Sequence, residues 1–294
     1  MPNHFPPPPK KHEGYVWLQR VELPAITKAR VRAKPSSKRV VISDQHYPLH
    51  DPKAEAIVLQ AIEAIRPKQT IINGDYYDLF SLSRFDKDKR VGKYFSLADE
   101  CVAGHRFLRQ LGEIVSAFDG EIVVLPGNHE IRWQKYLNKN VPELAQHPEA
   151  ERLWDYRKWF FPDESVCPLS FADEVFVGSR LRVTHGERVR GQPGQSARAM
   201  VEAMGSDIWM GHTHRQGLWP HRIPAFGEHG SEITRVGVEG GCLCAVGADY
   251  ARLADWHQGA GIIHEGSDGM WQAELFLIQN GKAIIPSLGA ELAA

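Results

Sequence analysis

The segment TIINGDYYD, residues 70–78, joins a short apolar run to a glycine and two carboxylates. Thr70–Asn73 has the β-branched composition of a buried strand. Gly74 ends the run, because glycine reaches backbone conformations that tight turns require. Asp75 and Asp78 follow directly. A buried strand that ends in acidic side chains predicts a ligand site at the carboxyl end of a sheet strand.

The same arrangement occurs four more times along the chain. Strand-like runs occupy residues 39–43, 122–125, 181–184 and 207–210. The polar segments that follow them are Asp44-x-His46, Gly127-Asn128-His129-Glu130, His185-Gly186 and Gly211-His212-Thr213-His214. Because ligands of α/β folds bind outside the carboxyl ends of the strands, we expect all five segments to converge in space.

The residue types of these segments are those of a metal centre. Imidazole nitrogens, carboxylates and an amide oxygen suit divalent zinc, manganese or iron. Two ions about 3.5–4 Å apart can hold both an attacking water and phosphoryl oxygens if one carboxylate bridges them. Asp75 is the bridge candidate, because it is central in the motif order and Gly74 lets the backbone come close. Any one segment alone also fits a turn or a solvated pair, but the five in order predict a two-metal hydrolytic centre.

From about Arg39 to His214, these segments resemble those of the calcineurin-like metallophosphoesterase superfamily. The resemblance implies one metal held by Asp44, His46, Asp75 and His214. It implies a second metal held by Asp75, Asn128, His185 and His212. It also implies that His129 is not a ligand but lies beside the leaving group, and that Asp78 orients it.

The implied function is metal-dependent hydrolysis of phosphate monoesters or diesters. A metal-bridging hydroxide would attack phosphorus in line, and His129 would protonate the departing oxygen. Manganese is the favoured ion, with iron, zinc or nickel as alternatives. Arg84 and Arg132 are candidate phosphate clamps. The Ser/Thr phosphatases of the superfamily place arginine where this chain has Leu79 and Pro126, which argues against a phosphoprotein substrate. A DNA-repair-type nuclease is the alternative enzyme, and a non-catalytic metal-binding scaffold is the alternative of another class.

The expected fold is α/β, a layered α/β/β/α sandwich of two mixed sheets with flanking helices. Asp51 can cap a helix that begins at Pro52 and stops before Pro67, and Ser96 can cap a second helix over residues 97–116. Beyond His214, strands are expected at residues 233–238, 243–246, 261–264 and 271–278. Asn280-Gly281 predicts a hairpin before residues 282–285.

The predicted organisation is a tail and one domain. Residues 1–36 form a proline-rich and basic tail, with a short strand at 15–23, and either pack loosely or contact a polyanion. Residues 37–294 form a single metallophosphoesterase domain with an aromatic-rich cap insertion at about 131–172. The rings of the cap either dock it on the core or stack nucleobases, and docking is favoured.

Composition agrees with a soluble enzyme. The 294 residues are 43% hydrophobic and 24% charged, and a net charge of −1 gives no global attraction to nucleic acid or anionic lipid. No apolar stretch approaches the ~20 residues of a membrane span, so we expect a cytoplasmic protein without a membrane partner. Its expected partner is a phosphate-ester substrate, with nucleic acid as the alternative. Cys242 and Cys244 are expected to be buried free thiols rather than zinc ligands.

Overall fold

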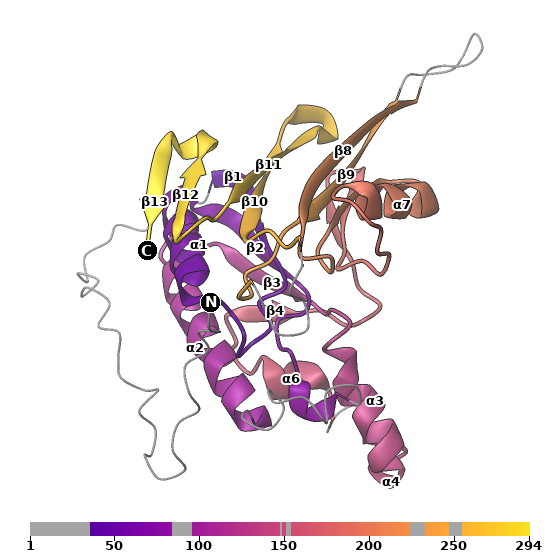
Figure 1. Ribbon diagram of the computed structural model, residues 1–294. Coiled ribbons are helices and arrows are strands. Elements are labelled where there is room, and N and C mark those ends of the chain that lie inside the picture. The colour runs from indigo at the N-terminus through magenta and orange to yellow at the C-terminus, as the bar shows by residue number, and fades with distance from the viewer. Residues whose placement is uncertain (1–35, 84–95, 148, 151–153, 224–232, 247–254) are drawn as a thin grey trace, which may run out of the picture.

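The computed structural model describes residues 36–83, 96–147, 149–150, 154–223, 233–246 and 255–294 (Figure 1). The first of its sheets has six strands in the order β11-β10-β1-β2-β3-β4. Four of them run parallel: β1 (Ser36–Ile42), β2 (Pro67–Asn73), β3 (Glu121–Leu125) and β4 (Val166–Pro168). β10 (Gly259–Glu265) pairs antiparallel with β1, and β11 (Trp271–Leu277) pairs antiparallel with β10.

The second sheet has five strands in the order β5-β6-β7-β9-β8. Its parallel centre consists of β6 (Leu181–Val183), β7 (Asp207–Met210) and β9 (Ile233–Gly240). The edge strands β5 (Val175–Val177) and β8 (Gln216–Ile223) are antiparallel to their neighbours. A separate ribbon pairs β12 (Lys282–Ile285) with β13 (Ala290–Ala293). Both large sheets are therefore mixed, as expected.

The two predicted helices are confirmed. α1 (Pro52–Ile65) begins after Asp51, whose side chain accepts hydrogen bonds from the backbone N–H groups of its first turn. α2 (Leu97–Ser116) begins after Ser96, which forms a capping box with Asp99. Further helices among the described residues are α3 (Ile131–Asn140), α4 (Pro142–Ala145), α6 (Tyr156–Phe160) and α7 (Gln195–Met204), and short 3-10 turns cover Phe80–Leu82, Ser267–Gly269 and Pro286–Leu288.

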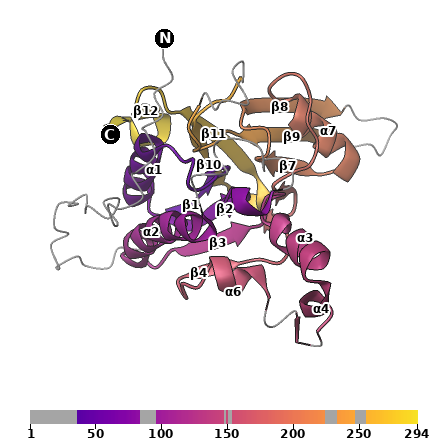
Figure 2. The same cartoon turned by 60° about the horizontal axis from the view of Figure 1, so that its bottom comes forward.

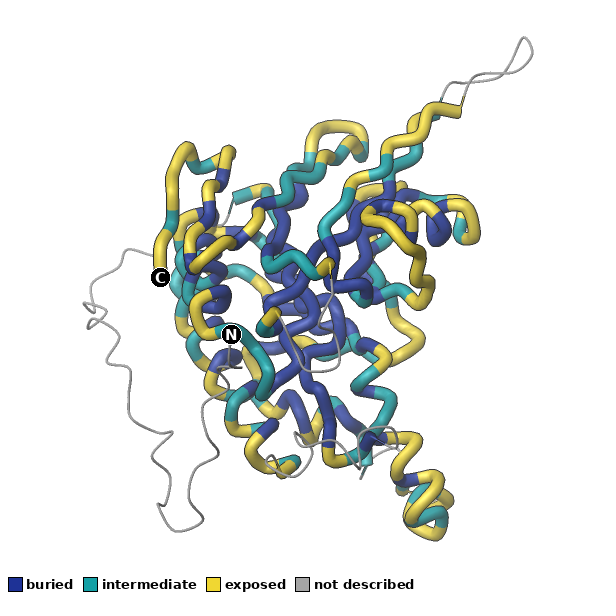
Figure 3. Tube along the Cα trace, in the orientation of Figure 1, coloured by how far each residue is buried: buried dark blue, intermediate teal, exposed yellow. Residues whose placement is uncertain are grey.

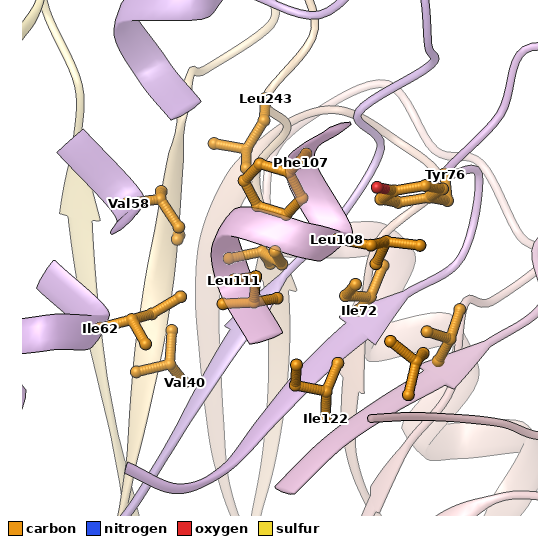
Figure 4. Close-up of a cluster of buried hydrophobic side chains, with 14 of the residues drawn as sticks. Val40, Val58, Ile62, Ile72, Tyr76, Phe107, Leu108, Leu111, Ile122 and Leu243 are labelled. Atoms are coloured by element: carbon orange, nitrogen blue, oxygen red, sulfur yellow. The ribbon is translucent and has the colours of Figure 1, made fainter. Parts of the chain in front are cut away.

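Side chains alternate between the two faces of each strand, so the two sheets and the helices outside them form four layers. On β1, Val40 and Ile42 pack with the buried faces of α1 and α2, whereas Val41 packs toward the second sheet. On β7, Trp209 faces the first sheet, and Ile208 and Met210 pack against α7. Figure 4 shows the contact of α1 and α2 with the first sheet, and Figure 3 shows the buried strands at the centre of the molecule. The α/β/β/α sandwich is confirmed.

The aromatic segment after β3 packs mainly on this core. Phe160 and Phe161 are buried against Tyr77 and Tyr76, with ring centroids 5.4 and 5.5 Å apart. Trp133 is also buried and lies edge-on to Phe160. Most of these rings therefore hold α3 and α6 on the first sheet, and β4 adds the end of the segment to that sheet as its edge strand.

Several local expectations differ from the structure. Residues 243–246 do not form a regular strand, and their one isolated bridge joins Cys244 to His50. The backbone of this segment instead donates hydrogen bonds to the loop after β1, from Leu243 and Cys244 to Asp44. β8 and α7 have no counterpart in the sequence prediction. β8 contains Gly217 and Pro220, which weaken a strand signal and which an edge strand tolerates. The turn at Asn280-Gly281 is present, but Lys282–Ile285 then pairs with β13.

Some expectations lie outside the described residues. They are residues 1–35 of the tail, with its strand at 15–23, and Arg84. Ser36, the last residue of the predicted tail, is the first residue of β1. Within the described ranges, no helix is both long enough and apolar enough to cross a membrane.

Candidate metal centre

The five polar segments meet at one edge of the sandwich. Three of them follow β1, β2 and β3 of the first sheet, and two follow β6 and β7 of the second. Backbone hydrogen bonds fasten them together: the N–H of His46 donates to the carbonyl of Asp75 at 3.0 Å, and that of Gly211 donates to His185 at 3.1 Å. The parallel pairing of β1, β2 and β3 places their carboxyl ends at the same edge, as the sequence predicted.

Five of the predicted ligands have a left-handed backbone. The φ angles are 55° at Asp44, 52° at His46, 47° at Asp75, 67° at His212 and 58° at His214. Side chains other than glycine rarely adopt this region, although Asp and His tolerate it better than most. Such strain persists only where the surrounding structure enforces it, and it concentrates at functional sites. The backbone therefore aims these side chains at one place at some cost in stability.

Two glycines allow the segments to approach each other. A Cβ atom on Gly74, where φ is 80°, would lie 2.5 Å from Nδ1 of His185. A Cβ atom on Gly127 would lie 2.2 Å from Oδ1 of Asp75. Any side chain at either position would displace a predicted ligand, which explains the glycines on physical grounds.

The first ligand cluster consists of Asp44, His46 and His214, whose candidate donor atoms all lie within 4.8 Å of one another. Nε2 of His214 lies 3.3 Å from Oδ1 of Asp44 and 3.0 Å from Nε2 of His46. All three residues are buried. They are the residues that the resemblance assigns to one metal, apart from the bridging Asp75.

The second cluster consists of Asp75, His185 and His212, again with donor atoms within 4.8 Å. Nε2 of His185 lies 3.3 Å from Oδ2 of Asp75 and 3.2 Å from Oδ1 of Asn128. The same Oδ2 atom of Asp75 lies 3.8 Å from Nε2 of His46 in the first cluster. One carboxylate oxygen of Asp75 thus faces both clusters.

These residues fit divalent ions. The donor set contains only nitrogen and oxygen atoms, which suits manganese, iron or zinc. Nδ1 of His212 is buried and has no hydrogen-bond partner among the described residues. A buried nitrogen without a partner is costly, and an ion can satisfy it. The structure is therefore compatible with divalent metal binding at this edge.

Outer contacts hold three of the imidazoles through their second nitrogen. Nδ1 of His46 lies 3.2 Å from Oδ2 of Asp78, and Nδ1 of His185 lies 2.8 Å from the carbonyl of Asn73. Nδ1 of His214 lies 3.6 Å from Sγ of Cys244. Such partners fix the tautomer and leave Nε2 free to bind an ion. Cys244 is buried like Cys242, and neither forms a disulfide. Their sulfur atoms lie within 4.8 Å of a ring nitrogen of His214, so their role as thiols rather than zinc ligands stays a prediction.

Charge interactions shift the pKa values of several candidate ligands. Burial would lower the pKa of His185, but the carboxylate of Asp75 raises it to about 9. Burial likewise opposes the charged form of His214, whose pKa rises to about 9 beside Asp44. Burial would raise the pKa of Asp44, and the imidazoles of His214 and His46 bring it below its ordinary value. The raised pKa values of His185 and His214 therefore reflect their pairing with carboxylates, whereas burial and the nearby His185 lower the pKa of His212.

His129 lies at the entrance to the centre, directly before α3. Its Nδ1 lies 2.9 Å from the carbonyl oxygen of Asp78 and 3.5 Å from the carboxylate of the same residue. Its Nε2 lies 3.8 Å from Oδ2 of Asp75. Arg132 donates to the carbonyl and carboxylate of Asp78 and lies 2.9 Å from Nε2 of His129. The structure thus brings His129, Asp78 and Arg132 together beside the metal ligands.

Glu130 has a structural role at this centre that the sequence analysis did not assign. Its buried carboxylate accepts hydrogen bonds from the backbone N–H groups of Asp75, Tyr77 and Gly127, at 3.1, 3.0 and 2.7 Å. Burial raises its pKa, the charge of Asp75 adds to this, and the N–H donors oppose it. The position of Glu130 next to His129 could have indicated this role from the sequence. An acidic side chain in the Gly-Asn-His segment can reach back to the loop after β2.

Comparison with proteins of known sequence gives relatives in bacteriophages. The chain is 28% identical over 237 residues to the Gene 54 protein of Mycobacterium phage D29, covering 78% of this chain and 89% of that protein. It is 26% identical over 238 residues to the Gene 54 protein of Mycobacterium phage L5, with the same coverage.

Among solved structures, similar chains include a Vps29 single mutant from Entamoeba histolytica, with a TM-score of 0.42 and 12% identity over 87% of this chain and 99% of that one. They also include the nuclease MPE of Pseudomonas putida, with a TM-score of 0.34 and 11% identity over 83% of this chain and 85% of that one. Residues 37–247 match the sequence profile of the calcineurin-like phosphoesterases, a span that contains all five polar segments. The chain belongs to the calcineurin-like phosphoesterase family.

Proposed function

We propose that this protein is a metal-dependent hydrolase of phosphate esters that uses two divalent ions, with manganese favoured. The observation that carries the proposal is the position of Asp75, whose Oδ2 atom faces His185 at 3.3 Å and His46 at 3.8 Å. His129 approaches the same oxygen at 3.8 Å and lies outside these two clusters, although its donor atom is also within 4.8 Å of those of His46 and Asp78. A shared carboxylate with a free imidazole beside it suits hydrolysis of a phosphate ester.

The ligand assignment follows the two clusters. Asp44, His46 and His214 would hold one ion, and His185, His212 and Asn128 would hold the other, with Asp75 shared. When bound, the two ions would supply the positive charge that lowers the pKa of an attacking water and offsets the charge of the phosphoryl oxygens. Because Asp44, Asp75 and three of the four imidazoles are buried and hydrogen-bonded, the chain holds their orientation before substrate arrives.

His129 would donate a proton to the departing oxygen. Its Nδ1–H can donate to the carbonyl of Asp78, which holds the ring so that Nε2 points toward Asp75 and the substrate. The carboxylate of Asp78 would stabilise the protonated ring from 3.5 Å. Arg132 lies close enough to His129 to bind a phosphoryl oxygen of the same substrate.

Parallel turnover assays test the proposal. Purified protein with added manganese is incubated with an aryl phosphomonoester, an aryl phosphodiester, and single-stranded and duplex DNA. We expect metal-dependent turnover of at least one of these, and at least 100-fold less with Asp75→Asn. No turnover of any substrate by fully metal-loaded protein would contradict the proposal and favour a non-catalytic scaffold.

A further inference from the structure

Helix α3 carries an exposed basic and aromatic stripe that starts at the candidate centre. Lys135 and Tyr136 lie three and four residues after Arg132, and Lys139 lies three and four residues after Tyr136 and Lys135, so the four side chains share one face of the helix. The opposite face is buried through Trp133 and Leu137. Lys135 and Lys139 are exposed, and Tyr136 is 38% exposed.

Arg132 pairs with Asp78, but the two lysines of the stripe have no acidic residue beside them on α3. The ten residues of α3 include three basic side chains and no acid, although the whole chain has a net charge of −1. Within the part of the chain that the structure describes, the side chains of Lys135 and Lys139 make no ion pair or hydrogen bond. A helix face that is merely solvated would be expected to carry both signs of charge.

The stripe begins at the proposed reacting groups. Arg132 binds Asp78 and lies 2.9 Å from Nε2 of His129, so its guanidinium belongs to the edge of the metal centre. Lys135 and Lys139 continue away from it, and one helical turn, about 6 Å, separates them along the axis. A strand of linked phosphates that reached the centre could therefore continue along α3.

A second basic segment flanks the centre on the side of α7, which stands apart from α3 (Figure 2). The loop after His185 exposes Arg188 and Arg190, with Glu187 as the one exposed acid among residues 187–190. Arg215, which follows His214, donates a hydrogen bond to the backbone carbonyl of Arg190 and so holds this loop beside the ligand segment. Positive charge is thus present on two sides of the centre.

We propose that the stripe on α3 binds the phosphate backbone of a single-stranded polynucleotide whose scissile phosphate lies at the metal centre. This inference rests on the proposed function and names the substrate class of the same site. Lys135 and Lys139 would contact phosphates, and the ring of Tyr136 between them would stack on an unpaired base. A small phosphate ester would need none of these groups, and a duplex would keep its bases away from Tyr136.

Equilibrium binding tests the inference without turnover. The binding of a fluorescein-labelled single-stranded DNA oligonucleotide is followed by anisotropy in EDTA, at several salt concentrations. Because each phosphate contact on a single strand contributes about 0.7 to the salt slope, Lys135→Ala with Lys139→Ala should lower that slope by about 1.4. We expect at least a tenfold loss of affinity at low salt. Tyr136→Ala should weaken binding about tenfold with little change in slope, because stacking releases no counterions.

A matched control removes the same charge elsewhere. Lys53→Ala with Arg109→Ala takes two exposed positive charges from α1 and α2 and should leave both affinity and slope near wild type. Thermal unfolding of every variant confirms that it is folded. Equal affinities for the stripe and control variants, or tighter binding of duplex than of single-stranded DNA, would overturn the inference.

The outcome is separable from that of the proposed function. The wild-type protein could hydrolyse an aryl phosphate but bind single-stranded DNA no better than the stripe variant does. That result would refute the inference without contradicting the proposed hydrolase function. Protein that binds the strand through the stripe but hydrolyses no ester would instead contradict the proposed function.

Discussion

Replacing Glu130 with alanine is expected to destabilise the protein even though Glu130 is not a proposed metal ligand. The carboxylate of Glu130 accepts three backbone hydrogen bonds, two at Oε2 from Asp75 and Gly127 and one at Oε1 from Tyr77. Its exposed fraction is 1%, so water does not replace it readily. Truncation leaves three buried N–H groups without an acceptor at the point where two loops meet.

The expected size follows from those three groups. A buried donor that loses its partner costs ~1–3 kcal/mol, so three of them lower the free energy of unfolding by ~3 kcal/mol or more. A typical domain is stable by only ~5–15 kcal/mol, and the loss is therefore a large fraction of the total. Glu130→Gln should be milder, because its one amide oxygen can keep the two bonds made at Oε2 while its NH₂ group faces the N–H of Tyr77.

Urea unfolding in EDTA measures this loss without a contribution from bound ions. Glu113→Ala on the exposed side of α2 is the control, and it should lie within ~0.5 kcal/mol of wild type. The order wild type, Glu130→Gln, Glu130→Ala is expected. A Glu130→Ala protein within ~1 kcal/mol of wild type would refute the reasoning, because it would show that these N–H groups are satisfied in another way.

Three further predictions concern the centre itself. His129→Asn should keep both ions but lose about 10²–10⁴-fold in rate on an alkyl ester, and much less on a nitrophenyl ester, whose leaving group departs unprotonated. Cys244→Ala should weaken metal binding about 10–100-fold, since it removes the acceptor that faces Nδ1 of His214 at 3.6 Å. Metal affinity should rise from pH 6 to pH 9 and protons should be released on binding, because His185 and His214, with pKa values of about 9, must lose protons first.

Each of these three predictions has a result that would contradict it. If His129→Asn lowered the rate equally on both esters, His129 would stabilise phosphoryl oxygens instead of protonating the leaving group. Titration calorimetry compares Cys244→Ala with Cys242→Ser, whose native thiol faces the carbonyl of His257 and makes no hydrogen bond to His214 among the described residues. A lost equivalent of zinc in Cys242→Ser would mean that the thiols are ligands. Calorimetry that shows no proton release between pH 6 and 8 would contradict the raised pKa values.

The sheet core was predictable because its physical signals are local. Apolar residues recur at helical spacing on α1, and those of this face are all buried: Ala54, Ile57, Val58, Ala61, Ile62 and Ile65. The caps Asp51 and Ser96 stand where their side chains predicted helix starts. The candidate ligand segments were equally predictable from the sequence, since each one follows a buried strand. Whether those residues bind ions stays a prediction that the geometry supports.

Other features depend on contacts distant in sequence, and the sequence did not reveal them. β8 owes its structure to pairing with β9 and carries Pro220, so periodicity alone did not indicate a strand. The role of Glu130 depends on N–H groups about fifty residues away along the chain, at Asp75 and Tyr77. The contact of Cys244 with His214 likewise joins a segment without regular pairing to a ligand loop.

The number of ions bound by wild-type protein and by Asp75→Asn tests the central claim most directly. Each protein is loaded with manganese, dialysed and analysed for metal per chain. We expect two ions in wild type and fewer in Asp75→Asn, because two ions would otherwise face each other with less negative charge between them. A wild-type protein that binds only one ion, or an Asp75→Asn protein that retains both with full turnover, would contradict the account.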